Sequence, residues 1–168
     1  MIGQLDVDAD LSNTEKVNRL FPLLPQNALY LCSDLKRTRQ TAAALHLSPV
    51  FEPRLREISY GAWEGLGFDA VPDPALARAF WETPGDIAPP GGESWNDLAQ
   101  RVGEVIDEVN GQGDGPVVVV AHMGSILAAL AHATGLPPAR ALSFRIDPLS
   151  LTRLDWLDGQ WAVTCVNG

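Results

Sequence analysis

Cysteine is scarce in this sequence. The 168 residues contain only Cys32 and Cys165, which are far apart and form neither a Cys-x-x-Cys pair nor a cluster with metal-ligand spacing. This spacing favours two buried thiols over a disulfide framework or a metal site. A Gly-x-Gly-x-x-Gly turn is also missing after every candidate strand, which argues against a nucleotide-dependent redox domain.

Basic residues and long apolar runs are few as well. Lys and Arg number 12 against 21 Asp and Glu, the net charge is −9, and no basic run occurs. This balance argues against nucleic acid or an anionic membrane surface as a partner. No apolar stretch reaches membrane-spanning length, and the acidic start "MIGQLDVDAD" is unlike a signal peptide. With 46% apolar residues, we expect one soluble, cytoplasmic domain over residues 1–168.

Helix and strand patterns alternate along the chain. The valine run at 117–121 shows no alternation, which predicts a strand buried on both faces. Asp158 and Gly159 separate two strand-like runs and predict a hairpin. The other expected elements are a helix over 12–24 with Ser12 as N-cap, strands at 28–33 and near residue 50, a helix over 34–46 that begins on Asp34, an irregular segment over 61–92, a helix after N-cap Ser94, and a small-residue helix that ends at Gly135. Together they predict an α/β fold with a mostly parallel sheet and a C-terminal antiparallel hairpin.

Chemically useful side chains follow three of the predicted strands. Arg37 follows the first strand, Glu57 the second and His122 the valine strand. Because ligands bind at the carboxyl ends of strands in open α/β sheets, we expect these side chains to converge there. A guanidinium binds phosphate through two hydrogen bonds, and a carboxyl group with a raised pKa protonates a leaving oxygen. An imidazole stabilises a transferring phosphoryl group or takes part in covalent transfer.

Each of these residues also has a purely structural interpretation. Arg37 could be an ordinary exposed helical arginine, and His122 could be a satisfied core histidine. Glu57 could form a surface ion pair with Arg54 or Arg56. The remaining histidines and three of the tryptophans are expected to be structural rather than functional: His46, His132, Trp63, Trp81 and Trp95.

Four motifs occur in an order and spacing that resemble the histidine phosphatase superfamily, which has the phosphoglycerate-mutase-like fold. They are "SDLKRTRQTAAAL", "LREISYGAWEG", "PPGGESWNDLAQRV" and "VVVVAHMGSI". The resemblance extends from about Gly3 to the C-terminal hairpin, and the chain is similar to the small bacterial phosphatases that include α-ribazole phosphatase. It implies a three-layer α/β/α sandwich in which Arg37 binds phosphate, Glu57 donates a proton and His122 stabilises the transferred phosphoryl group, with no metal or organic cofactor.

The same resemblance implies a reaction class and a kind of partner. The expected substrate is a small phosphorylated metabolite, with neither nucleic acid nor a membrane as a partner and with a homo-oligomer left open. The 62–92 segment is short, whereas mutases commonly carry insertions that position their substrate. Phosphomonoester hydrolysis is therefore favoured over mutase activity.

The sequence departs from the family in two places. The family opens with a strand that ends in Arg-His-Gly and carries the nucleophilic histidine, but no Arg-His pair occurs in these 168 residues. We therefore expect that the sequence starts after that strand, that the valine strand has an open flank, and that the chain as written is inactive. The alternative is a non-catalytic relative that binds a phosphorylated ligand or a protein partner. Met123 stands where the family commonly has glycine, so it is expected to crowd the substrate and to resist a positive φ.

Overall fold

The centre of the fold is a parallel three-stranded sheet in the order β2-β1-β3, and an antiparallel hairpin of β4 and β5 forms a second sheet. This computed structural model describes residues 1–113 and 115–168. Leu31 of β1 lies opposite Val50 of β2 and Val119 of β3. The strands are β1 (Leu29–Cys32), β2 (Val50–Phe51), β3 (Val117–Val120), β4 (Arg153–Leu157) and β5 (Gln160–Cys165). The predicted mostly parallel sheet with a C-terminal hairpin is confirmed.

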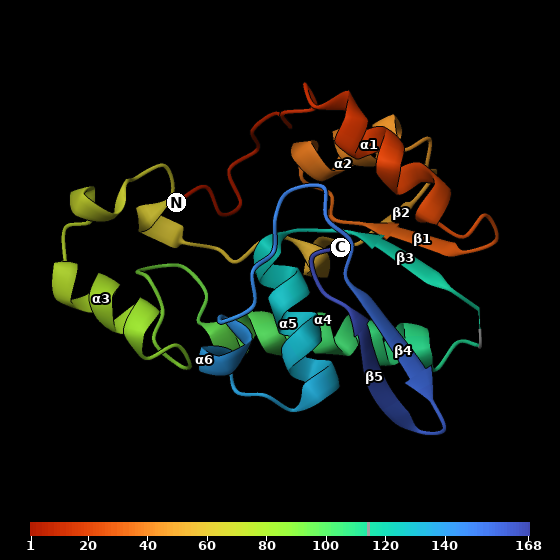
Figure 1. Cartoon of the computed structure of the whole chain (residues 1–168). Coiled ribbons are helices and arrows are strands. Elements are labelled where there is room, and N and C mark those ends of the chain that lie inside the picture. Colours follow the sequence, from red (N-terminus) through yellow and green to blue (C-terminus); the bar gives the residue numbers. More distant parts are fainter. Residues whose placement is uncertain (114) are drawn as a thin grey trace.

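Helices cover the parallel sheet on both sides. Figure 1 shows α1 and α2 on one side, with α4 and α5 on the other, which gives the three layers. The helices are α1 (Thr14–Leu20), α2 (Lys36–Ala44), α3 (Pro74–Glu82), α4 (Trp95–Asn110), α5 (Met123–Thr134) and α6 (Pro138–Ala141). Within the described residues, none of them combines the length and the apolar composition that crossing a bilayer requires.

The segment over 61–92 contains regular structure, so the prediction of an irregular segment is wrong there. It forms a lobe beside the layered part of the fold and includes α3 (Figure 1). Asp73 caps α3 by accepting a hydrogen bond from the Leu76 N–H, and Pro74 occupies the first helical position. Both are strong helix-start signals in the sequence.

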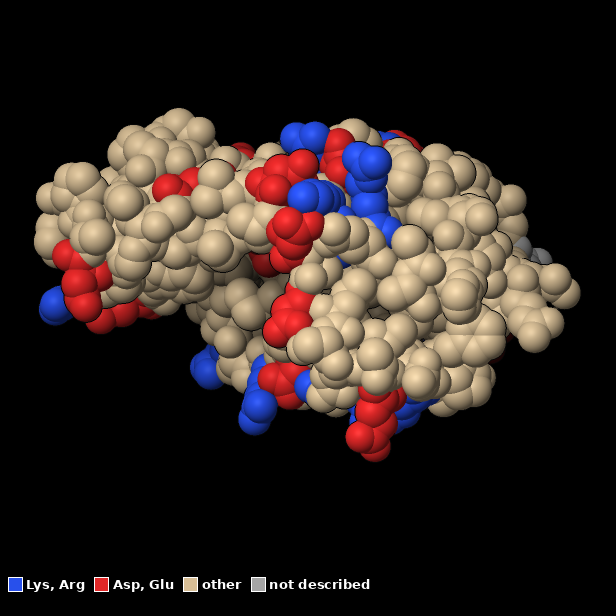
Figure 2. All heavy atoms as spheres, turned by 90° about the horizontal axis from the view of Figure 1, so that it is seen from above, with Lys and Arg blue, Asp and Glu red and all other residues tan. Residues whose placement is uncertain are grey.

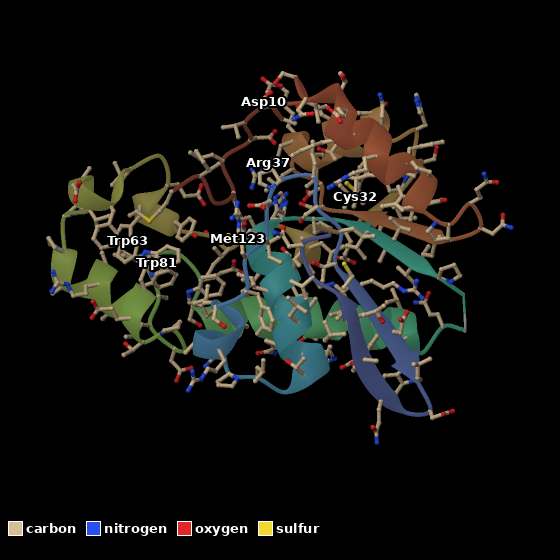
Figure 3. The ribbon with its side chains drawn as sticks, viewed as in Figure 1. Asp10, Cys32, Arg37, Trp63, Trp81 and Met123 are labelled. Carbon is tan, nitrogen blue, oxygen red and sulfur yellow. The ribbon has the colours of Figure 1, made fainter. Side chains whose placement is uncertain are left out.

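An aromatic core fills this lobe. Phe80 meets the Trp63 ring edge to face with centroids 5.7 Å apart, and it stacks on Trp95 at 6.1 Å. Figure 3 places Trp63 and Trp81 in the lobe, away from Arg37. Trp63 and Trp95 are buried and join one hydrophobic cluster, so the predicted packing role of the tryptophans is confirmed.

The predicted start of the helix over 34–46 is wrong in its capping residue. The helix begins at Lys36, and Leu35 at the N-cap position makes no side-chain capping bond. Asp34 instead forms a bidentate ion pair with Arg56, with a 2.7 Å bond between Nε and Oδ1. Asp6 replaces it, because its Oδ1 accepts the Lys36 N–H at 2.6 Å. A carboxylate from a distant segment therefore satisfies the helix end.

Two other local predictions are confirmed. Ser94 caps α4 in a full capping box: its Oγ accepts the Asp97 N–H, and the Asp97 carboxylate accepts the Ser94 N–H. The β4–β5 hairpin turns at Asp158 and Gly159, which both have positive φ. Two consecutive positive φ angles match the twist of hairpin strands, which explains why this pair of residues is such a clear signal.

The sequence predicted that the valine strand is buried on both faces, and this prediction is wrong. Val119 is 45% exposed, whereas its register partner Leu31 is 7% exposed on the same face of the sheet. Position explains the difference: β1 has a strand on each side, but β3 pairs only with β1 within residues 1–113 and 115–168. The open flank that was expected for this strand is therefore present in the described part of the chain.

Candidate functional site

Three segments that follow the parallel strands bring Arg37, Glu57 and His122 together. Arg37 lies in the first turn of α2, just after β1. His122 is the N-cap residue of α5, directly after β3. Glu57 follows the short turn after β2. Figure 3 shows Arg37 above the start of α5, where Met123 is labelled. The expected convergence of the three side chains at one end of the sheet is present, while their chemical roles stay predictions.

Arg37 and His122 are in direct contact. The Arg37 Nε–H donates to His122 Nδ1 at 3.2 Å, and His122 Nε2 lies 2.8 Å from Ser33 Oγ. Because arginine can only donate, Nδ1 of His122 must be the unprotonated nitrogen. Neutral His122 therefore carries its proton on Nε2 and donates it to Ser33.

His122 stays neutral over the physiological pH range. Its side chain is 7% exposed. Burial, followed by the positive charges of Arg37 and Arg101, lowers the pKa of His122 from 6.5 to about 3. An anion bound beside the ring would oppose both causes, because a nearby negative charge favours the imidazolium form.

Contacts within the described residues use only some of the hydrogen-bond donors of the Arg37 guanidinium. Its NH1 donates to the Leu5 carbonyl at 2.9 Å, and its NH2 donates to the Gly3 carbonyl at 2.6 Å. With the Nε–H on His122, three of the five N–H groups have protein partners. Two N–H groups are left over, which is the number that a bidentate phosphate contact uses.

Glu57 lies against the first turn of α5. Its Oε1 accepts the Ile58 N–H at 2.8 Å, and its Oε2 accepts the Gly124 N–H at 3.2 Å. Burial raises the pKa of the carboxyl group, against the lowering effect of these two amides and of Arg37 and Arg101. The carboxyl group therefore holds a proton more readily than an exposed glutamate does.

The ion-pair interpretation of Glu57 is wrong, because both candidate partners are engaged elsewhere. Arg54 pairs with Glu52 and Glu108, at 2.8 and 2.7 Å. Arg56 pairs with Asp34. Within residues 1–113 and 115–168, neither arginine forms a hydrogen bond or ion pair with the Glu57 carboxylate, which faces α5.

Met123 lies next to His122 at the start of α5. It is 42% exposed and is not among the non-glycine residues with positive φ. The expected backbone strain at this position is therefore wrong, because a residue in the first turn of a helix has ordinary helical angles. Its predicted contact with substrate stays a prediction.

The other two histidines have structural surroundings. His46 packs edge-on against Phe21, with ring centroids 6.0 Å apart, and His132 bonds to Asp107 at 2.9 Å. Both lie outside the Arg37–His122 contact. The part of the chain that the structure describes contains no group of three or more His, Cys, Asp or Glu residues that could hold a metal ion.

Sequence reasoning missed the part played by residues 3–9 and by Ser33. Besides the two carbonyls that accept from Arg37, this segment supplies Gln4, whose Nε2 donates to the Glu57 carbonyl at 3.0 Å. No local pattern in residues 3–9 indicates these contacts. Ser33 could have been found, because it directly follows a buried strand whose next residues carry the other polar groups.

Charges of both signs surround the site. Lys36, which precedes Arg37 in the chain, forms an ion pair with Asp8, with 2.7 Å between Nζ and Oδ1. Figure 2 shows basic and acidic side chains side by side over the middle of the face seen from above, without a continuous basic patch. An anion at this site would therefore be held by a few specific donors rather than by a broad positive field.

Comparisons with known proteins give a consistent family. The model of the histidine phosphatase superfamily (branch 1) matches residues 3–168. A glucosyl-3-phosphoglycerate phosphatase from Mycolicibacterium vanbaalenii is 40% identical over 152 residues, which cover 82% of this chain and 68% of the relative. The chain spans 40% of the length of three further relatives that are 35% identical to it.

Solved structures agree with this. Mycobacterial glucosyl-3-phosphoglycerate phosphatase in complex with inorganic phosphate is 31% identical, with a TM-score of 0.85 over 100% of this chain and 90% of that chain. The α-ribazole phosphatase from Shigella flexneri has a TM-score of 0.86 over 100% of this chain and 88% of that chain, but is 22% identical. The second similarity concerns the fold alone.

Proposed function

This chain belongs to the histidine phosphatase superfamily (branch 1), and on that premise we propose that it is a phosphomonoester hydrolase whose site includes Arg37, Glu57 and His122. The observation that carries the proposal is the 3.2 Å contact between Arg37 Nε and His122 Nδ1. It sets a fixed cation against a neutral imidazole beside a carboxyl group with a raised pKa. Such a combination of perturbed groups is typical of catalytic sites.

Arg37 binds the phosphoryl group in this proposal. Among the described residues, two of its N–H groups have no partner, and each can donate to a phosphoryl oxygen. The carbonyls of Gly3 and Leu5 hold the guanidinium plane while it does so. His122 lies beside Arg37 at the same phosphoryl group; the bound anion raises its pKa, and the imidazolium form can donate a hydrogen bond to a phosphoryl oxygen.

Glu57 supplies the proton. A histidine nitrogen attacks phosphorus, the phosphorus–oxygen ester bond breaks, and the proton of the Glu57 carboxyl group passes to the leaving oxygen. Water then attacks the phosphohistidine while the Glu57 carboxylate takes a proton from it, which releases phosphate and restores the acid. The raised pKa of Glu57 suits both halves of this cycle.

We propose that none of the three histidines in these 168 residues is the nucleophile of this cycle. His46 and His132 bond or pack elsewhere, and His122 is the residue held by Arg37. We therefore expect no turnover from this polypeptide by itself. The absence of an Arg-His pair also keeps a second function open, in which the site binds a phosphorylated ligand or a phosphorylated protein without hydrolysing it.

The proposed substrate is a small phosphorylated metabolite, acted on in the cytoplasm. The phosphatase from Mycolicibacterium vanbaalenii, 40% identical, makes glucosyl-3-phosphoglycerate the first compound to test.

Calorimetry with orthovanadate, a phosphate analogue, tests the binding half of the proposal. Arg37→Gln should weaken binding at least about tenfold, because it removes charge-assisted hydrogen bonds worth about 1.5–3 kcal/mol each. Arg39→Gln is the matched control: Arg39 lies two residues further along α2, where its guanidinium stacks over Phe51 at 5.4 Å. Equal affinities for the wild type and Arg37→Gln would contradict the assignment.

Hydrolysis of p-nitrophenyl phosphate tests the catalytic half. The 168-residue chain should match a buffer control, and a version extended at its start by a strand ending in Arg-His should turn over. Turnover by the unextended chain that disappears in His122→Ala would mean that His122 is itself the nucleophile. Vanadate binding without turnover in either version would favour the non-catalytic function.

A further inference from the structure

Arg101, on the inner side of α4, uses every donor it has. Its Nε and one NH2 proton bind the Glu93 carboxylate at 2.6 and 2.8 Å. Its two NH1 protons go to the carbonyls of Arg54 and Arg56, at 2.7 and 2.8 Å. The remaining NH2 proton goes to the Glu57 carbonyl at 3.0 Å. These five bonds saturate the guanidinium, so it has no capacity left for a ligand.

Three of these five bonds fix one short stretch of backbone. Residues 54–57 have no regular structure beyond a single turn, yet three of their four carbonyls accept from the same side chain. The side chain of Arg101 is 16% exposed, and that of Glu93 is 22% exposed. Water therefore competes weakly for these bonds, which makes them stronger than surface contacts.

Glu93 extends the restraint on the backbone two residues beyond Glu57, to Ser59. Its Oε2 also accepts the Ser59 N–H at 2.8 Å, and its own N–H donates to the Ser59 carbonyl at 2.8 Å. The pair of Arg101 and Glu93 therefore holds the backbone on both sides of Glu57. From this restrained backbone, the Glu57 side chain points towards the first turn of α5, where Oε2 accepts the Gly124 N–H.

The start of α5 also forms hydrogen bonds with residues 55–57. Ser125 Oγ lies 2.9 Å from both the Leu55 and the Arg56 carbonyls. The Gly124 N–H donates to Glu57 Oε2. Residues 55–57 are therefore hydrogen-bonded both to the Arg101 guanidinium and to the start of α5.

We propose that Arg101 is the positioning residue of Glu57, and that its forked hydrogen bonds, rather than its charge, place the carboxyl group against α5. This rests on the proposed function only in giving Glu57 a catalytic use. A role of the positive charge and a role of the forked hydrogen bonds can be told apart with Arg101→Lys, because lysine keeps the charge and loses the forked geometry.

Several charged groups act on Glu57 and must be kept in view. Arg37 from α2 and Arg101 from α4 both lower its pKa, and burial outweighs them. Tyr60 and Glu64 lie in the following turn, and the pKa of Tyr60 is raised by burial and then by Glu57 and Glu64. All of these except Arg101 are unchanged in an Arg101 variant, so a difference in Glu57 reports on Arg101.

The experiment is an NMR titration of the whole chain with carboxyl-labelled glutamate, in which the Glu57 resonance is assigned by its absence from Glu57→Gln. In Arg101→Lys and in Glu93→Gln, the loosened backbone should let water reach the carboxyl group, and its pKa should fall towards the ordinary glutamate value. Amide exchange at Gly124 should speed up at least about tenfold, because its acceptor is no longer held. No substrate or turnover is needed, so this result is independent of the proposed function.

Arg54→Met is the matched control, since Arg54 also joins this stretch to α4 through Glu108 but leaves Glu57 alone. Its Glu57 pKa and its Gly124 exchange should equal those of the wild type. A wild-type Glu57 pKa in Arg101→Lys, with a higher pKa in Arg101→Met, would mean that Arg101 acts through charge and would overturn the proposal. Equal changes in Arg101→Lys and Arg54→Met would also overturn it, because they would reflect a general loss of stability.

Discussion

Gly124, in the first turn of α5, lies directly against the Glu57 carboxylate, and its replacement by alanine should be costly. A Cβ at this position would lie 2.1 Å from Glu57 Oε1 and 3.2 Å from Leu98 Cδ2. The first distance is far below van der Waals contact, so the carboxylate has to move. Moving it lengthens the bonds that it accepts from Ile58 and Gly124.

The size of the effect follows from three contributions. Overpacking a filled site costs about 1–3 kcal/mol. Weakening a hydrogen bond to a charged group costs up to about 1.5–3 kcal/mol, less whatever water returns to the displaced carboxylate. Alanine regains about 0.5–1 kcal/mol over glycine in a helix. We therefore expect Gly124→Ala to lower the free energy of unfolding by about 1.5–5 kcal/mol.

Urea denaturation followed by tryptophan fluorescence measures this difference. Gly67→Ala is the control, because its Cβ would meet nothing within 4 Å and its φ is negative. It should stay within about 0.5 kcal/mol of the wild type. If Gly124→Ala were as stable as Gly67→Ala, the carboxylate could not be held against α5 as described.

Two further predictions concern pH and the edge of the sheet. Because the folded-state pKa of His122 is about 3 and the unfolded value is 6.5, the unfolded chain binds an extra proton between these values, and stability falls as the pH drops through that window. Denaturant unfolding from pH 7 to pH 3 should show the wild type losing on the order of 4 kcal/mol more than His122→Asn; parallel curves would refute the low pKa. Taking the difference between the two proteins largely removes the effect of Glu57, whose raised pKa acts in the opposite direction. The edge of β3 that is unpaired among the described residues should bind hydrophobic dyes, and a strand added along it should raise the Tm by about 2–4 °C per kcal/mol gained; an unchanged Tm would mean that the sheet closes without it.

Features that depend only on residues close together in the sequence could be predicted from it. The Asp158-Gly159 turn needs two positive φ angles, and few other residue pairs supply them. Ser94 and Asp97 satisfy each other within one turn, so no distant residue competes. The convergence of Arg37, Glu57 and His122 followed from a parallel sheet, because all three leave strands in the same direction.

Features decided by distant partners were not readable. Asp34 is a good helix cap by type, but Arg56 offers it two hydrogen bonds from 22 residues away. Asp6, which lies 30 residues before Lys36 in the sequence, then accepts the Lys36 N–H at the start of α2. The exposure of Val119 depends on how many strands flank β3, which a run of valines does not encode.

The most direct test of the account is ¹⁵N NMR of the three histidine rings while inorganic phosphate is added. His46 and His132 serve as internal controls, since one packs on Phe21 and the other bonds to Asp107. If Arg37 and His122 together hold a phosphoryl group, only the His122 resonances should move, and its pKa should rise from about 3 as the anion binds. Saturating phosphate that leaves His122 unchanged, or that moves all three rings alike, would contradict the claim that this is a phosphoryl site.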